Sequence, residues 1–319
     1  MARYARVAAA AISGTTYYVS SSGSDSSSGT SPDRAWRTVD RVNRAHLNPG
    51  DGVLFQGGAT FSDSTLMPNV SGTSTTPIVF GSYGTAQATI TQGVWFVDHN
   101  YLTFDSLHLG PNQGLQGGNN SGHYANHITI QRCTVDFGSG ASANPRIGIN
   151  AVGDNWTIQG NTVQNIGNSG MLLQGDTYTI YANTITNTGV DSAISYGKHG
   201  IYLKASNATV TNNTITHFSE DAVSPRMRNS TISGNVFAHG PIGIGFFQYD
   251  SVAGTSNWTD NTITDTTAAA IYVDGGAGGL YPTRESFVIT GNTLQIASGD
   301  VMNLKPTSGT YSVHGNTIL

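Results

Sequence analysis

The chain has 319 residues, of which 37% are hydrophobic and only 10% are charged, and its net charge at pH 7 is −5. A disordered chain of such low hydrophobicity would normally carry more net charge, so disorder is a poor fit. With 14 Lys and Arg residues a broad nucleic-acid surface is not expected. A membrane span is not expected either, because no apolar run reaches about 18 residues. The single cysteine, Cys133, excludes an internal disulfide and a multi-thiolate metal site.

The first segment, residues 1–14, resembles a shortened export signal. Two arginines, Arg3 and Arg6, precede the apolar run Val7–Ile12. A secretory signal peptide has a basic part and then an apolar part in this order, although this apolar run is at the lower limit of length. We therefore interpret residues 1–14 as a signal remnant or an N-terminal extension. The polar, Lys-poor composition of the rest of the chain also favours a secreted, extracellular protein.

The next segment, residues 15–61, predicts an N-terminal cap and the first strands. A strand and a Gly/Ser-rich loop run from Tyr17 to Pro32 (YYVSSSGSDSSSGTSP), and a turn followed by a strand runs from Pro49 to Phe55 (PGDGVLF). Between them, the spacing of apolar residues in Ala35–Ala45 predicts a short helix. These motifs resemble the cap of secreted right-handed β-helix polysaccharide-degrading enzymes. Such a cap would cover the open end of the hydrophobic core.

The remaining segment, residues 62–319, contains a repeated element in which an apolar residue is followed three positions later by Asn. Successive copies of this Asn lie 22 to 31 residues apart, at Asn161, Asn183, Asn213, Asn235, Asn261, Asn292 and Asn316. The flanking residues alternate between apolar and polar, as strands do. Variable spacing around a constant short core predicts stacked coils of strands joined by turns of different lengths. We therefore expect an all-β fold, a right-handed single-stranded parallel β-helix (solenoid), behind the cap.

The repeated Asn residues are expected to be structural. Each would lie at a bend, where its amide can bond to the backbone and to the Asn one coil away. Upstream, Cys133 occupies the same position in the repeat. We expect it to be a buried, unreactive thiol.

A second strand follows in each coil, and its third and fifth residues should point outward. These outward pairs include Tyr202/Lys204, Ser224/Arg226, Gly245/Phe247, Tyr272/Asp274 and Asn303/Lys305. Lys204 and Arg226 would stand in one column on adjacent coils, roughly 5 Å apart. The positive charge of Arg226 would then lower the pKa of Lys204 and make it a better base.

This basic pair suits cleavage of a uronic-acid polymer by β-elimination. The reaction needs a cation to neutralise the carboxylate, a base to remove the C5 proton, and a donor to protonate the leaving O4. We expect Lys204 and Arg226 to be the catalytic residues. The candidates for substrate binding are Tyr202, His199, Lys198, Arg228, Phe247, Tyr249, Tyr272 and Lys305.

The two coils also resemble the catalytic coils of polysaccharide lyase family 6, which contains alginate lyases and a dermatan-cleaving chondroitinase. The stretch Leu203–Thr209 (LKASNAT) parallels the family's VKSSxNT, and Arg226–Asn235 (RMRNSTISGN) parallels LRHGxxxTVEGN. The resemblance implies Lys204 as the base, Arg226 as proton donor or neutraliser, and alginate as the leading substrate. The family's carboxylate five residues before the Lys, which helps to hold Ca²⁺, is His199 in this chain. We therefore predict no metal ligands and no cofactor, and we leave a Ca²⁺ requirement open.

Three other functions remain open. A glycoside hydrolase needs two carboxylates, for which the candidates are Asp221, which follows Glu220, Asp250 and Asp274. A uronan C5-epimerase would share the lyase chemistry up to the carbanion, and a non-catalytic β-helix could bind carbohydrate in a groove. The expected partner is an acidic polysaccharide, with no nucleic acid and no membrane, and we expect a monomer.

Overall fold

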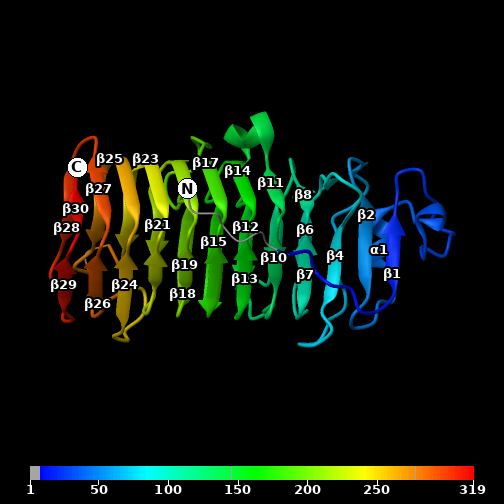
Figure 1. The fold of residues 1–319 in the computed structure, drawn as a ribbon, viewed down its shortest axis with the longest axis horizontal. Coiled ribbons are helices and arrows are strands. Elements are labelled where there is room, and N and C mark those ends of the chain that lie inside the picture. The colour runs from blue at the N-terminus through cyan, green and yellow to red at the C-terminus, as the bar shows by residue number, and fades with distance from the viewer. Residues whose placement is uncertain (1–7, 145, 277) are drawn as a thin grey trace. The chain divides into compact units, whose positions relative to one another are not determined.

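The computed structural model describes residues 8–144, 146–276 and 278–319. Contacts divide the chain into a first unit, Met1–Gly138 with Asn150–Thr162, and a second unit, Ser139–Ile149 with Val163–Leu319 (Figure 1). Three elements lie at the sequence boundaries of the units: the 3₁₀ helix η2 (Gly138–Ala143), β12 (Ile149–Val152) and β14 (Thr162–Ile166). Of the proposed signal remnant, residues 1–7 lie outside the described part of the chain.

The first unit is built from parallel strands that stack in three columns. The longest column runs through β1 (Thr16–Val19), β2 (Gly52–Gln56), β4 (Ile78–Tyr83), β7 (Leu102–Asp105), β10 (Thr129–Gln131) and β13 (Trp156–Gln159). The second contains β3 (Thr60–Phe61), β5 (Ala88–Ile90), β8 (Leu107–Leu109) and β11 (Thr134–Asp136), and the third pairs β6 (Val94–Phe96) with β9 (Leu115–Gly117).

The cap of the first unit contains a shorter helix than the sequence predicted. A 3₁₀ turn, η1 (Pro32–Arg34), is followed by α1 (Val39–Asn43) in place of a helix over Ala35–Ala45. The residues before α1 are extended because Trp36 forms a parallel bridge with Val19 and because the N–H groups of Arg37 and Thr38 donate to the carboxylate of Asp25.

The second unit repeats the three-column arrangement. One column runs through β16 (Tyr178–Tyr181), β19 (Thr209–Thr211), β22 (Thr231–Ser233), β24 (Thr255–Thr259), β26 (Ser286–Thr290) and β29 (Tyr311–His314). A second contains β17 (Thr184–Thr188), β20 (Thr214–Phe218), β23 (Val236–Phe246), β25 (Thr262–Val273), β27 (Thr293–Ile296) and β30 (Thr317–Ile318). The third contains β15 (Met171–Asp176), β18 (Ile201–Ser206), β21 (Asp221–Pro225), the far ends of β23 and β25, and β28 (Asp300–Leu304).

Side-chain alternation in the third column positions the candidate site. In β18, Ile201 and Leu203 are fully buried, whereas Tyr202 and Lys204 on the opposite face are only partly buried. The register places Tyr202 beside Ser224 of the next coil, which confirms the predicted outward column. The strand order and the parallel pairing likewise confirm an all-β parallel solenoid.

The Asn ladder of the second unit is confirmed. Each side-chain amide N–H donates to the side-chain oxygen of the next Asn at 2.9 or 3.0 Å, through Asn183, Asn213, Asn235, Asn261, Asn292 and Asn316. The same oxygens also accept the backbone N–H groups of the preceding Asn residues. The ladder therefore satisfies the backbone at each bend as well as the side chains.

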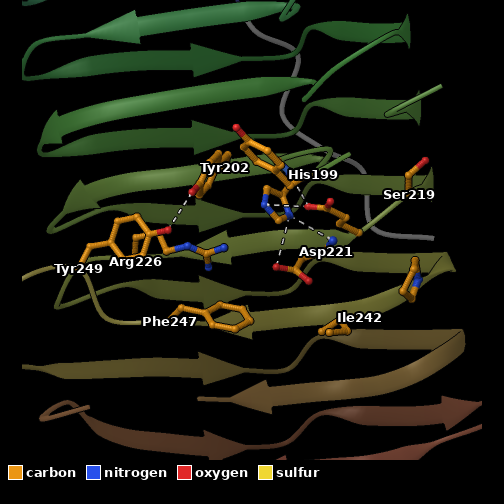
Figure 2. Close-up of a pocket in the computed structure, with 12 residues that line it drawn as sticks. His199, Tyr202, Ser219, Asp221, Arg226, Ile242, Phe247 and Tyr249 are labelled. Atoms are coloured by element: carbon orange, nitrogen blue, oxygen red, sulfur yellow. Dashed lines mark hydrogen bonds and ion pairs between the residues drawn. The ribbon is translucent and has the colours of Figure 1, made fainter. Parts of the chain in front are cut away.

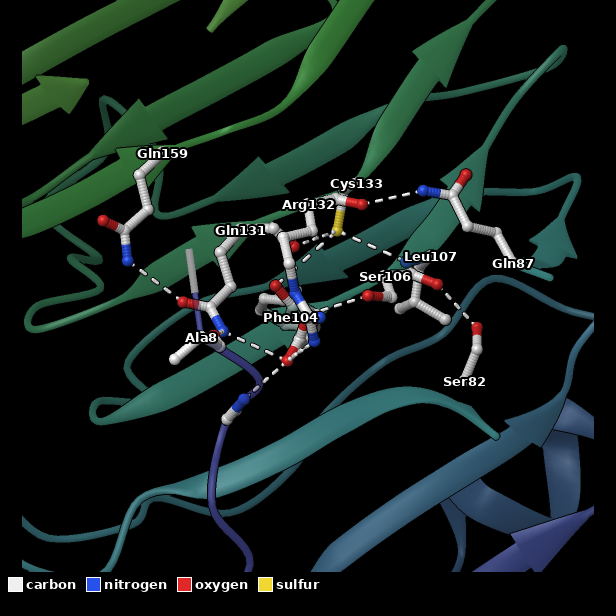
Figure 3. Close-up of polar contacts among 12 residues, drawn as sticks. Ala8, Ser82, Gln87, Phe104, Ser106, Leu107, Gln131, Arg132, Cys133 and Gln159 are labelled. Atoms are coloured by element: carbon white, nitrogen blue, oxygen red, sulfur yellow. Dashed lines mark hydrogen bonds and ion pairs between the residues drawn. The ribbon is translucent and has the colours of Figure 1, made fainter. Parts of the chain in front are cut away.

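In the first unit, Cys133 fills a slot of the ladder (Figure 3). Its backbone N–H donates to Asn161 Oδ1 at 2.9 Å, and the side chain is buried. Burial raises the pKa of the thiol to about 12. Because the thiolate is the reactive form, the structure agrees with an unreactive cysteine.

A polar cluster beside Cys133 holds the described part of the N-terminal segment (Figure 3). Arg132 makes two hydrogen bonds to the carboxylate of Asp105, at 2.8 and 2.6 Å. The same carboxylate accepts the backbone N–H of Ala10, and Gln131 donates to the carbonyl of Ala8. The segment therefore lies against β7 and β10.

Candidate functional site

The second unit contains a cavity of about 380 Å³ beside β18, β21 and β23 (Figure 2). Cavities of about 300–1,000 Å³ commonly hold small ligands. One part of its lining is aromatic and cationic, with Tyr202, Phe247, Tyr249 and Arg226. Another part carries the titratable side chains His199, Glu220 and Asp221. The cavity thus combines sugar-sized apolar faces with groups that can donate or accept protons.

Arg226 is a buried cation held by aromatic rings. It follows β21 and is only 6% exposed. Its guanidinium carbon lies 4.3 Å from the ring centroid of Phe247, 4.9 Å from that of Tyr202 and 5.4 Å from that of Tyr249. Such ring faces attract a cation and compensate part of its lost hydration.

The hydrogen bonds of Arg226 do not involve its Nε–H group. Its Nη1 donates to the carbonyl of Gly245 at 3.2 Å and to that of Pro225 at 3.4 Å. Its Nε is buried and has no hydrogen-bond partner among the described residues. Figure 2 shows the guanidinium reaching toward Asp221 and His199, above the ring of Phe247. A buried, unpaired N–H of a guanidinium costs free energy, and an anionic ligand beside the guanidinium would offset part of the cost of burying this cation.

Lys204 lies at the edge of the same cluster and not in the cavity lining. Its ammonium nitrogen is 4.5 Å from the ring centroid of Tyr202 and 5.7 Å from that of Tyr249. The hydroxyl groups of these two tyrosines lie 3.3 Å apart. Burial, and then the charge of Arg226, lower the pKa of Lys204, although Tyr249 acts in the opposite direction. Lys204 and Arg226 therefore flank the ring of Tyr202, and the pKa of Lys204 is displaced in the direction that a base requires.

His199 and Asp221 face each other, and both are neutral in mildly acidic solution. Burial, with the charges of Arg226 and Lys204, holds the pKa of His199 well below its usual range, and burial raises the pKa of Asp221 to about 7. The ring nitrogen Nδ1 of His199 accepts the backbone N–H of Asp221 at 3.3 Å. The proton of the neutral ring is therefore on Nε2, which lies 3.3 Å from Glu220 Oε2. Because the ring is uncharged, the 3.3 Å contact between Nδ1 and Asp221 Oδ2 is not an ion pair.

The carboxyl group of Asp221 lines the cavity and is closely packed by its neighbours. Ser224 donates a hydrogen bond to Asp221 Oδ2. The neighbouring coil has Gly245 at this level, where a Cβ atom would lie 2.8 Å from the Asp221 carboxyl group. Any residue with a side chain at position 245 would therefore press against Asp221.

The two other candidate carboxylates have structural partners instead. Asp250 pairs with Arg228 at 2.8 Å and also accepts from Gln248 at 3.0 Å. Asp274 Oδ2 accepts the backbone N–H groups of a following loop, Gly276, Gly278 and Gly279. Neither carboxylate lines the cavity.

The remaining predicted binding residues lie outside the cavity lining. Tyr272 packs beside it, with its ring centroid 5.4 Å from that of Phe247. Lys198 contributes its backbone N–H to Glu220, and Arg228 is held by Asp250. Lys305 follows β28, where its backbone N–H donates to the carbonyl of Val273.

Sequence reasoning missed several lining residues, which are Tyr196, Ser219, Pro241 and Ile242, and it gave Glu220 no committed role. Tyr196 is 80% exposed and lies in the long turn before β18. Tyr196 and Ser219 lie in turns, and Pro241 and Ile242 lie within β23, where its register with β25 shifts. The one available signal was the acidic pair Glu220–Asp221 at the start of a strand whose end carries Arg226.

The residues at the family's Ca²⁺ position do not fit that ion. Ca²⁺ takes six to eight oxygen ligands, whereas the position five residues before Lys204 is the neutral, hydrogen-bonded ring of His199. Within the described ranges no group of three or more His, Cys, Asp or Glu side chains is arranged to hold a metal ion.

The helices in these ranges include none that is long and apolar enough to cross a membrane.

Several known carbohydrate-active enzymes are similar to this chain. A curated lacto-N-biosidase from Bifidobacterium longum subsp. longum is 42% identical over 78 residues, which is 23% of this chain and only 5% of the length of that protein. The crystal structure of a GH136 lacto-N-biosidase from Eubacterium ramulus has a TM-score of 0.61 at 15% identity and covers 95% of this chain and 67% of its own. A mannuronic acid specific family 6 polysaccharide lyase from human gut microbiota has a TM-score of 0.55 at 15% identity, covering 86% and 78%.

At these identities the structural likeness establishes the shared fold. The family described as right-handed β-helix region matches residues 113–318. This match confirms the predicted handedness as well as the strand arrangement. The chain belongs to the right-handed β-helix family.

Proposed function

We propose that this protein is a polysaccharide lyase that cleaves a uronic-acid-containing polysaccharide by β-elimination. The observation that carries the proposal is the cluster in which the half-buried Lys204 and the buried Arg226 both pack on the ring of Tyr202. A lysine of lowered pKa beside a cation with an unpaired donor is suited to removing a proton next to a carboxylate. The lyases and hydrolases that share the fold support an enzyme acting on carbohydrate.

In the proposed reaction, Arg226 binds the uronate carboxylate and stabilises the charge that develops when C5 is deprotonated. Neutral Lys204 takes the C5 proton, the C4–C5 double bond forms, and the C4–O4 bond breaks. The leaving O4 takes a proton from the hydroxyl pair of Tyr202 and Tyr249. Burial raises the pKa of Tyr249, so its hydroxyl keeps its proton until the leaving group needs it.

The test measures the ultraviolet absorbance of the unsaturated uronate product on alginate, pectate, glucuronan and glycosaminoglycans. Lys204→Ala should lower the rate by about 100-fold or more, the usual contribution of a general base. Lys204→Arg is the matched variant, because it keeps the cation but not a group that can be a neutral base. Product formation by either variant at the wild-type rate would refute the role of Lys204.

Because the residues at the family's Ca²⁺ position do not fit that ion, EDTA should leave the wild-type rate unchanged.

One observation favours glycoside hydrolysis as a second candidate function. Asp221, whose pKa burial raises to about 7, lines the same cavity as the carboxylate of Glu220. A protonated carboxyl group near an ionised one is the arrangement with which glycosidases supply acid and base. In this case reducing ends would appear without ultraviolet absorbance. Asp221→Asn would abolish the activity, and Lys204→Ala would not.

A further inference from the structure

We infer that the cavity takes a neutral sugar next to the uronate, so that polymers in which acidic and neutral sugars alternate bind better than polymers of uronate alone. This rests on the proposed function in one respect, the assignment of the uronate to Arg226 and Lys204. It replaces the expectation of alginate, which is built from uronate alone. The charged side chains of the cavity differ between its two ends.

The positive charge lies at the aromatic end. Arg226, with its unpaired Nε, lies among Tyr202, Phe247 and Tyr249, and Lys204 lies just beyond Tyr202. Figure 2 shows Tyr249, Arg226 and Phe247 entering from one side, and Ser219 and Ile242 on the other side of His199 and Asp221. One uronate carboxylate can be neutralised at the aromatic end.

The other end carries the opposite charge. Glu220 Oε2 accepts the N–H groups of Gly197 at 2.9 Å and Lys198 at 3.1 Å, and it also faces His199 Nε2 at 3.3 Å. The side chain is thereby fixed in place while it remains 28% exposed. A second uronate at this end would bring two carboxylates together, which costs free energy, whereas the hydroxyl groups of a neutral sugar can donate to Glu220.

The groups between the two ends are uncharged and polar. His199 is neutral, and the carboxyl group of Asp221, with a pKa of about 7, is largely protonated in mildly acidic solution. Both can exchange hydrogen bonds with hydroxyl or acetamido groups. This part of the cavity therefore suits a neutral sugar in contact with Glu220.

The test measures binding by isothermal titration calorimetry with the full chain carrying Lys204→Ala, so that no probe is cleaved. The probes are an alternating glucuronate–N-acetylglucosamine hexasaccharide and a hexamannuronate of equal length. The alternating probe should bind at least about tenfold more tightly. Adding Glu220→Gln, which keeps the size and one acceptor oxygen, should tighten hexamannuronate binding several-fold and weaken the alternating probe. The control, Asp265→Asn, removes the same charge from an exposed site paired with His239 and should change neither affinity.

Equal or tighter binding of hexamannuronate would overturn the inference, as would an equal effect of Glu220→Gln on both probes or a failure of both probes to bind. Product formation by the wild-type protein separates this inference from the proposed function. Preference for the alternating probe with no unsaturated product would keep the inference and refute elimination. Unsaturated product formed faster from mannuronate than from the alternating polymer would keep elimination and refute the inference.

Discussion

For single residues of the site, burial decides the protonation state. His199 and Asp221 lie 3.3 Å apart and would form an ion pair in water-like surroundings at mildly acidic pH. Here burial lowers the pKa of His199 and raises that of Asp221, so both groups stay neutral. The charges of Arg226 and Lys204 also disfavour protonation of His199. The positive charge of the site therefore stays with Arg226 and Lys204. The pair is therefore a neutral hydrogen-bonding surface.

The pH dependence of stability follows from the carboxyl group of Asp221. Its pKa rises from 3.8 to about 7 on folding, so the folded protein binds this proton more tightly than the unfolded chain. The resulting stabilisation is complete below about pH 4 and is lost as the pH rises through 7. The melting temperature of the wild type should therefore fall relative to that of Asp221→Asn between pH 4 and 8, as measured by circular dichroism. His199, Glu220, Ser224 and Arg226 surround the group in both proteins, so their titration affects both.

A difference between the two melting temperatures that does not change with pH would contradict a raised pKa of Asp221. A wild type that gains stability over Asp221→Asn as the pH rises would indicate an ionised carboxyl group paired with Arg226.

The guanidinium of Arg226 should not be replaceable by an ammonium. Arg226→Lys keeps the charge but loses the planar group that lies against Phe247 and Tyr202 and the bond to the carbonyl of Gly245. We expect a loss of at least about tenfold in kcat/KM, with a lower melting temperature, because each contact of a cation with a ring contributes about 0.5–2 kcal/mol. Arg284→Lys is the control, since this residue donates to the carbonyl of Ser251 from an exposed position. Full activity of Arg226→Lys would show that charge alone suffices.

At the scale of elements, the Asn ladder ties the coils of the second unit together. Asn235 donates to the carbonyl of Val210 and to Asn261, and its side-chain oxygen accepts from the backbone N–H of Asn213. All these groups are buried, so no water can replace the lost partner. In a solenoid, where each coil contacts its neighbours, such bonds act between adjacent coils.

Asn235→Ala should therefore cost about 3 kcal/mol or more in the free energy of unfolding, since each unpaired buried group costs about 1–3 kcal/mol. Asn316→Ala removes similar bonds, to Ile289 and Asn292, but at a partly exposed position where water can take their place. Urea titration should show a clearly smaller loss for Asn316→Ala. Equal losses would mean that burial does not set the strength of the ladder.

At the scale of the whole molecule, the repeated features were predictable and the cavity was not. The position of each ladder Asn and the outward direction of Lys204 follow from spacing and alternation, because both are properties of a strand and its neighbour. The cavity also needs Tyr196, which comes from a turn of irregular length, and Ile242, which lies where the register of β23 shifts, and neither feature follows the repeat. Likewise, Asp250 and Asp274 had the right chemistry, but tertiary contacts bind them to Arg228 and to loop N–H groups.

The low charge of the whole chain predicts that salt will affect binding but not folding. Only 10% of the residues are charged, and the fold depends on apolar packing and on the neutral Asn ladder. Raising NaCl from about 0.1 to 1 M shortens the screening length from about 10 to 3 Å. The urea midpoint should therefore change little, while KM for a uronate polymer should rise several-fold, since Lys204 and Arg226 attract its carboxylates. A KM that is independent of salt would argue against an acidic substrate. A urea midpoint that falls clearly with salt would show that ion pairs such as Arg132–Asp105 contribute to stability.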